Sequence, residues 1–398
     1  MSMRLVSCAA ILLLGLAAPA VAQQGKPIKI AFIQDKTGLL EDYAKQEING
    51  FTLGLEYATK GTMTVAGHKI EVIWKDSQLK PDVGRNLIAE AYGDDGADIA
   101  IGGTSSAVAL AMLPVAQDFK KVFIVEPAVA DSITGDKWNR YIFRTGRNSS
   151  QDAIAGALAL GNQEAVIATL AQDYAFGRDG VAAFKKALEG TKAKVVYEEY
   201  APPATTDFTA PAQRIFDALS KYKGRKILAV AWAGPSPLPK LKQLNPERLG
   251  IEVSSGGNTL SAMAAYKDFP GMEGAAYYYY GLPPKNPVND WLVAEHEKRF
   301  HSPPDFFTCG GMAAAMAVVE ALTKTGGSTD TEKLIAAMEG MEFQTPKEKM
   351  IFRKEDHQAM QEMYAFKIKV DPKVAWAIPE LTRVIKIDEM KVPIENHR

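Results

Sequence analysis

The segment 99–131 constrains the fold of this chain more than any other. An apolar run at 99–101 ends in Gly-Gly-Thr-Ser-Ser, and a second apolar run at 122–125 ends in a loop of small residues at 126–131. The helical pattern at 107–117 joins them. The segment is therefore a strand–helix–strand unit, whose two loops lie at the carboxyl edge of a parallel sheet. Open α/β sheets bind ligands at that edge.

The first of these loops has the composition of an anion site. Gly102 and Gly103 let the backbone approach a ligand closely. Thr104, Ser105 and Ser106 can cap the following helix and present N–H and O–H donors. A capped loop that binds nothing has the same composition, so the residues alone leave both interpretations open.

Strand and helix patterns alternate on either side of this unit, at 28–33, 43–59, 70–74 and 80–92. The alternation restarts at 165–169 after a polar, strand-like stretch at 148–152, and it continues to 275–280. Repeated βα order predicts a doubly wound parallel sheet. Two consecutive α/β runs predict two similar lobes, with a crossover near 146–150. Late helical patterns, among them 311–323, predict that the chain returns to the first lobe before it ends on the second.

The first 22 residues have the pattern of an export signal. Arg4 precedes an apolar core at 5–16, and Ala20-Val21-Ala22 offers a cleavage site. No comparable apolar run follows, and the order of the segments argues against lipidation, so we expect a soluble, periplasmic chain. After cleavage Cys309 would be the remaining cysteine, which leaves no internal disulfide. A formal net charge of −1 argues against nucleic acid or an anionic membrane as a partner.

Motifs that would carry chemistry are missing from the sequence. The histidines are scattered without the spacing of a metal site, and neither a G-x-S-x-G elbow nor a P-loop occurs. The 102–106 loop lacks the glycine spacing of a dinucleotide site. Cys309 lies among small residues without a nearby base, which is typical of a packing residue. We therefore predict no catalytic residue, no metal and no cofactor.

Aromatic residues gather where strands end. The sequence places Tyr43, Tyr174, Phe176, Trp232 and Phe306 at such positions. They predict a cleft lined by aromatic rings, although each taken singly is more typical of a core. Strand alternation over 277–280 would direct two of the four tyrosines to either face.

Several motifs occur in an order that resembles a known family. They are 30–49 (IAFIQDKTGLLEDYAKQEIN), the 102–106 loop, Pro127-Ala-Val-Ala130, Phe143-Arg-Thr145 with Ser149-Ser-Gln, Phe176-Gly177, and Asp356-His-Gln358 followed by Met363-Tyr-Ala-Phe-Lys-Ile. Together they resemble the branched-chain-amino-acid type of periplasmic substrate-binding protein of ABC importers, including its aromatic-acid-binding subgroup. The resemblance covers essentially the whole mature chain.

This resemblance implies a type I periplasmic-binding fold with two α/β lobes and three hinge crossovers. The expected division is 27–146 plus 283–346 for the first lobe and 147–282 plus 347–398 for the second. The family's carboxylate-binding loops fall on 104–106 and on Ala128, Val129 and Ala130. Its aromatic contacts fall on Tyr43, Phe176 and Phe306.

Two departures from the family pattern bear on the ligand. The region where amino-acid binders place an acid reads Ser254-Ser-Gly-Gly-Asn258, and the hydroxyl of the second carboxylate loop is replaced by Ala130. We therefore expect a small aromatic or phenylpropanoid carboxylate, with Asn258 in the site. The alternative is a branched-chain or other amino acid, with Asp173 or Asp35 as the missing acid. An exported hydrolase and a sensor lobe are further alternatives. The expected partner is the membrane permease of an ABC importer, and we expect a monomer.

Overall fold

The larger of two parallel sheets has six strands in the order β2-β3-β1-β4-β5-β6. The computed structural model describes residues 25–396, so the predicted export signal lies outside the described residues. All neighbours in this sheet are parallel except β2, which is antiparallel to β3. The strands are β1 (Gly25–Gln34), β2 (Thr64–Val65), β3 (His68–Asp76), β4 (Ile99–Gly102), β5 (Phe123–Val125) and β6 (Ile142–Arg144).

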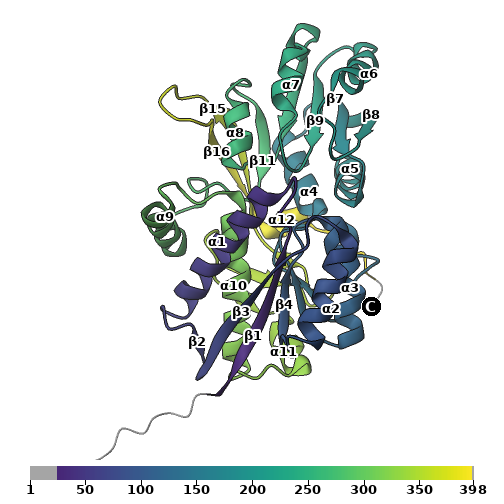
Figure 1. Ribbon diagram of the computed structural model, residues 1–398. Coiled ribbons are helices and arrows are strands. Elements are labelled where there is room, and N and C mark those ends of the chain that lie inside the picture. The colour runs from purple at the N-terminus through teal and green to yellow at the C-terminus, as the bar shows by residue number, and fades with distance from the viewer. Residues whose placement is uncertain (1–24, 397–398) are drawn as a thin grey trace, which may run out of the picture.

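Helices cover both faces of this sheet, as Figure 1 shows. Along β1, Ile30 and Phe32 pack toward α1, α10 and α11, whereas Ala31 and Ile33 pack toward α2 and α3. Burial on both faces explains the uninterrupted apolar run of β1. We call this sheet and its helices the first lobe. The helices are α1 (Glu41–Ala58), α2 (Pro81–Gly93), α3 (Ser106–Phe119), α9 (Pro287–Phe300), α10 (Phe306–Lys324) and α11 (Thr331–Met338).

Glycines allow α1 and α10 to touch backbone to backbone. A Cβ atom added at Gly50 would lie 2.0 Å from the carbonyl oxygen of Thr308, and one at Gly311 would lie 2.2 Å from that of Glu47. Any side chain at these two positions would push the helices apart. The helix predicted at 311–323 therefore returns to the first lobe, as the sequence indicated.

The second lobe has a parallel sheet in the order β10-β9-β7-β8 and, beside it, an antiparallel sheet in the order β11-β15-β16. Leu170 and Leu228 pack against α6, while Ile167 and Ile227 face α4 and α5. The strands are β7 (Ala165–Gln172), β8 (Ala193–Ala201), β9 (Lys226–Ala231), β10 (Ile251–Ser255), β11 (Glu273–Ala276), β15 (Met363–Lys369) and β16 (Ile378–Ile385). The helices are α4 (Ser149–Leu160), α5 (Ala175–Ala187), α6 (Thr209–Ser220), α7 (Leu238–Gln243), α8 (Leu260–Tyr266) and α12 (Ile387–Met390).

A small antiparallel sheet precedes the final return to the second lobe. It consists of β12 (Glu342–Phe343), β13 (Met350–Phe352) and β14 (Ala359–Met360). Its side chains Phe343, Phe352 and Ala359 belong to the core beneath the first sheet. We therefore propose to end the first lobe near residue 360 rather than at 346; the remaining lobe boundaries stay predictions.

Two local expectations were wrong. The polar stretch 148–152 begins helix α4 instead of a strand-like link, because Asn148 and Gln151 form a reciprocal capping box. The strand predicted at 275–280 ends at Ala276, so strand alternation does not apply to the tyrosine run. Tyr277, Tyr278 and Tyr279 are all buried.

Helix α10 is more apolar than the sequence pattern predicted. This helix is long and apolar enough to cross a membrane by length and composition, with a mean hydropathy of 1.5. In the structure 89% of the most apolar 18 residues of this helix are buried inside the protein. Its apolar surface is therefore accounted for by packing in the core of the first lobe.

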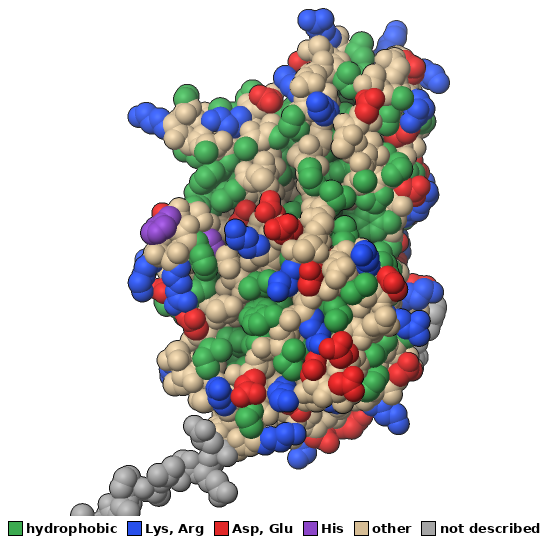
Figure 2. Space-filling model, viewed as in Figure 1, with side chains coloured by type: hydrophobic (Ala, Val, Ile, Leu, Met, Phe, Trp, Pro, Cys, Tyr) green, Lys and Arg blue, Asp and Glu red, His purple; other side chains and the backbone are tan. Residues whose placement is uncertain are grey.

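Charged side chains of both signs are interspersed over the face shown in Figure 2. Several form ion pairs, such as Arg140 with Glu332 at 2.6 Å and Arg299 with Glu56 at 2.6 Å. Exposed pairs of this kind stabilise a fold by about 0–1 kcal/mol each. The fold therefore rests on its apolar cores.

Candidate ligand-binding site

A cavity of about 670 Å³ begins between the two lobes. Its wall is formed by the loops that follow β4, β5 and β6 on the first lobe and β7, β9 and β10 on the second. These are carboxyl ends of parallel strands, as the sequence pattern predicted. The predicted site residues on its wall are Tyr43, Thr104, Ser106, Ala128, Val129, Tyr174, Phe176, Trp232 and Phe306.

Three predicted residues do not line the cavity. The backbone N–H of Ser105 donates to Asp35 Oδ2 at 2.8 Å, and that of Ala130 donates to Ser106 Oγ at 3.2 Å. Both donors are therefore used within the protein. Asn258 lies next to lining residues, and its buried amide has no hydrogen-bond partner among the described residues.

The loop after β4 is held by hydrogen bonds from its own hydroxyl groups. Thr104 Oγ1 donates to Gln34 Oε1 at 2.5 Å and accepts from the Asp35 N–H at 3.1 Å. Its proton is therefore not free for a ligand. Ser106 Oγ accepts from Ala130, so its own proton remains available to a ligand oxygen. Ser106 also opens α3, whose N-terminus favours an anion.

The buried side chain of Arg144 holds the loop at 128–130 through hydrogen bonds to its backbone. Arg144 Nη1 donates to the carbonyl of Ala130 at 2.7 Å, and its Nε donates to Gln358 at 2.6 Å. On the other side the N–H of Ser149 donates to the carbonyl of Val129 at 2.8 Å. Burial lowers the pKa of Arg144 to about 10, so the side chain stays charged at neutral pH. The loop is therefore rigid although its own side chains are small.

Aromatic rings enclose the cleft from both lobes. The Tyr43 ring lies 4.2 Å from that of Phe307, between centroids, and Tyr174 lies 5.8 Å from Phe176. Trp232 stands edge-on to Phe208 at 5.1 Å. Such pairs add about 0.5–1.5 kcal/mol beyond the area they bury. The wall is suited to a flat, apolar ligand.

Sequence reasoning missed the main cation of the cavity. Arg147 follows β6, is 9% exposed and lines the cavity. Its Cζ lies 5.1 Å from the ring of Phe306 and 5.5 Å from that of Tyr277. Its Nε donates to Asp152 at 3.3 Å, whereas its two terminal nitrogens make no hydrogen bond to the described residues. A guanidinium in this position can bind a carboxylate through two parallel bonds.

The signal that could have revealed Arg147 was its place in the chain. It is the first charged residue after β6, and β6 ends at the ligand-binding edge of the sheet. Because the following stretch was interpreted as a strand-like link, no helix was expected to direct Asp152 to the same cavity.

Two buried carboxyl groups lie near this arginine. A Cβ atom added at Gly310 would lie 2.3 Å from Glu126 Oε1 and 3.0 Å from Glu47 Oε1, so both groups converge on that glycine. Burial raises the pKa of Glu126 to about 7, against a hydrogen bond from Thr145 and the charge of Arg147. Burial and the neighbouring Glu126 raise the pKa of Glu47 well above its usual value. At least one of the two holds a proton at neutral pH.

The acids proposed for an amino-acid ligand do not face the cavity. Asp35 accepts hydrogen bonds from Ser77 and Ser105, and Asp173 is paired with Arg178 at 2.6 Å. Asp152 lines the cavity instead. Within residues 25–396, no histidine or cysteine lines the cavity, and no cluster of side chains could hold a metal ion.

The fold and the cleft define a two-lobe solute-binding protein. The model of the periplasmic binding protein family matches residues 27–373, and the chain belongs to this family. This membership implies a periplasmic location and confirms the resemblance drawn from the sequence.

Solved structures of similar chains share this fold. An ABC-type branched-chain amino acid transporter protein from Rhodopseudomonas palustris CGA009 is 67% identical, with a TM-score of 0.83 over 93% of this chain and 100% of that one. A solute-binding protein of an ABC transporter from Rhodopseudomonas palustris BisB5, in complex with 3,4-dihydroxybenzoic acid, is 30% identical, with a TM-score of 0.80 over 91% and 98%. Among curated proteins, Leu/Ile/Val-binding protein homolog 6 of Brucella melitensis is 24% identical in sequence over 79% of this chain and 81% of its own length.

Proposed function

We propose that this protein captures an aromatic carboxylate between its lobes and delivers it to the membrane permease of an ABC importer. The observation that carries the proposal is the buried guanidinium of Arg147, which sits among the rings of Tyr277, Phe306 and Phe307 with its terminal nitrogens unpaired. A carboxylate would satisfy those donors, and the rings would cover an aromatic body. The relative that holds 3,4-dihydroxybenzoic acid supports this ligand class.

A second candidate is an amino acid. Asp152 supports it, because a carboxylate on the cavity wall beside Arg147 could receive the ammonium group of a zwitterion. The 67%-identical relative, which is described as a branched-chain amino acid transporter, points the same way. Against it, Asp152 is already paired with Arg147. Freeing it to bind an ammonium would leave the buried guanidinium of Arg147 without this partner, which is costly.

A thermal-shift screen separates the two candidates. We expect benzoate and 3-phenylpropanoate to raise the melting temperature and leucine and valine not to; a ligand at 100 times its Kd stabilises by about 2.7 kcal/mol. Asp152→Asn should leave aromatic-acid binding within a few-fold of the parent, because the ligand binds the guanidinium. Stabilisation by leucine that is lost in Asp152→Asn would establish the amino-acid function instead.

We propose further that the protein binds without turnover and acts as a monomer. No histidine or cysteine of the described chain lines the cavity, and Asp152, the acid nearest the proposed carboxylate site, is paired with Arg147. Mass spectrometry after incubation should recover the bound acid chemically unchanged, and a product peak would indicate an enzyme. Light scattering with and without ligand checks the monomer.

A further inference from the structure

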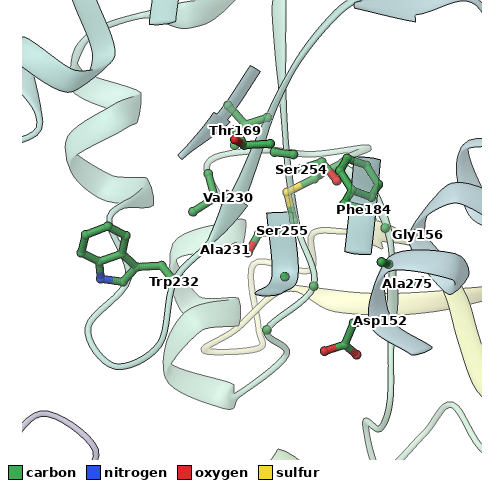
Figure 3. A pocket seen from close by; sticks show the side chains of 18 of the residues that line it. Asp152, Gly156, Thr169, Phe184, Val230, Ala231, Trp232, Ser254, Ser255 and Ala275 are labelled. Atoms are coloured by element: carbon green, nitrogen blue, oxygen red, sulfur yellow. The ribbon is translucent and has the colours of Figure 1, made fainter. Parts of the chain in front are cut away.

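The cavity does not end at the cleft but continues into the second lobe along α4. Ser149, Asp152, Gly156 and Leu160 all line it, and their spacing places them on one face of the helix. At 1.5 Å per residue, Ser149 and Leu160 are about 16 Å apart. The cavity thus has an inner arm, far longer than a single benzoate ring requires. Figure 3 shows this region, with Asp152 and Gly156 on one side.

Small side chains on the sheet leave this space empty. Alternate strand residues share a face, and here Thr169 of β7, Ala229 and Ala231 of β9 and Ser254 of β10 lie on one face and line the cavity. The opposite face of the same sheet is filled, because Leu170 and Leu228 pack against α6. The face toward α4 and α5 therefore packs as a core at Ile167 and Ile227 and also lines the cavity.

One polar atom in the arm lacks a partner. Thr169 is 2% exposed, and its Oγ1 forms no hydrogen bond with any described residue. Figure 3 labels Thr169 among the side chains that line the pocket. Three residues separate Thr169 from the end of β7, or about 10 Å at 3.3 Å per residue. Buried hydroxyl groups are normally paired, so this one points to a polar ligand atom.

We infer that the inner arm receives an extended apolar stem of the ligand and that Thr169 pairs with a neutral hydrogen-bonding group on that stem. The inference rests on the proposed function, because the carboxylate end would remain in the cleft. The ligand class is thereby narrowed to elongated aryl-alkyl or hydroxyaryl-alkyl carboxylates. A charged group does not suit the part of the arm that Gly156, Leu160 and Ala229 line, because these residues are apolar. Charged residues such as Arg225, Glu252 and Glu273 line other parts of the cavity.

Calorimetry with ω-phenylalkanoates of increasing length tests this inference. From benzoate to 5-phenylpentanoate, affinity should rise about three- to four-fold for each methylene that becomes buried. Gly156→Leu should remove this gain while leaving benzoate binding within about two-fold. A side chain at Gly156 would meet only Phe184, whose Cε2 lies 3.7 Å from the added Cβ, so the variant should fold. Ala182→Leu, on the exposed face of α5, is the matched control.

A second variant tests the hydroxyl group. Thr169→Val keeps the shape of the side chain, and it should weaken binding of 5-(4-hydroxyphenyl)pentanoate about three- to ten-fold relative to 5-phenylpentanoate. Two outcomes would overturn the inner arm and leave the proposed function standing. One is an affinity that does not depend on the chain length of the acid. The other is an equal loss of affinity for short and long acids in Gly156→Leu. Failure of every carboxylate to bind would overturn both.

Discussion

The hydroxyl oxygen of Tyr43, on the first lobe, accepts a hydrogen bond of 2.8 Å from the backbone N–H of Gly234, on the second. At another point of the interface, Asp179 of α5 accepts bonds of 3.1 and 2.9 Å from the N–H and Oγ of Ser132. These hydrogen bonds are among those that join the two lobes.

Removing the hydrogen bond between Tyr43 and Gly234 should weaken ligand binding. Tyr43→Phe keeps the ring against Phe307 and deletes the acceptor, at a cost of about 0.5–1.5 kcal/mol. The expected loss of affinity is about two- to ten-fold by calorimetry. Tyr57→Phe, whose ring packs on Trp291 at 4.9 Å away from the cavity, is the control. Equal effects of the two variants would contradict a role for the Tyr43 bond.

Ligand should compact the molecule in solution. The chain crosses between lobes near 146–150 and near 280–283, and a hinge at these segments would open the cleft. Small-angle scattering should give a smaller radius of gyration once the aromatic acid is bound. Identical profiles at saturating ligand would count against hinge closure.

Arg147→Met should abolish most carboxylate binding. Hydrogen bonds to charged groups contribute about 1.5–3 kcal/mol, which corresponds to roughly a ten- to hundred-fold change in Kd. Arg178→Met is the matched control, because Arg178 is exposed and pairs with Asp173 outside the cavity. Undiminished binding by Arg147→Met would place the carboxylate elsewhere, with the Ser106 hydroxyl as the remaining donor.

The buried pair Glu47 and Glu126 should make the protein less stable as pH rises. Both pKa values are raised in the folded state, that of Glu126 to about 7, so the folded protein holds more protons than the unfolded chain above about pH 4.5. The protonated carboxyl groups therefore contribute to the free energy of unfolding at low pH, and this contribution is lost as the pH rises through about 7. Glu47→Gln should flatten this dependence and raise the melting temperature at pH 8. The exposed Glu355→Gln should leave the slope unchanged; a slope equally steep in Glu47→Gln would refute the assignment.

Much of the fold could be predicted from hydrophobic periodicity. Apolar runs such as β1 and β9 are unambiguous because both faces of each strand are covered. The start of α4 was missed because its first turn is polar, and only the pairing of Asn148 with Gln151 marks it as a helix. The tyrosine run 277–280 was predicted as part of a strand because aromatic residues favour strands. In the structure it forms the loop after β11, and tertiary packing buries this loop.

The site was predicted through its loops rather than through its charges. Strand ends fix where Thr104, Ser106 and Val129 lie, so these residues could be placed from the sequence. Whether a hydroxyl or N–H remains available depends on partners far along the chain, as with Gln34 for Thr104. The inner arm likewise depends on small residues of α4 and β9 meeting across a sheet, which no local pattern reveals.

The glycine contact of α1 with α10 has a consequence for the order of folding. Gly50 meets Thr308, so the glycine-bearing face of an early helix is covered by a segment that emerges near the end of synthesis. Contacts of such sequence separation form slowly. A growing or partly exported chain that stops short of residue 324 cannot complete the first lobe. The first lobe is thus completed when nearly all of the polypeptide is available, which suits a protein that folds in the periplasm.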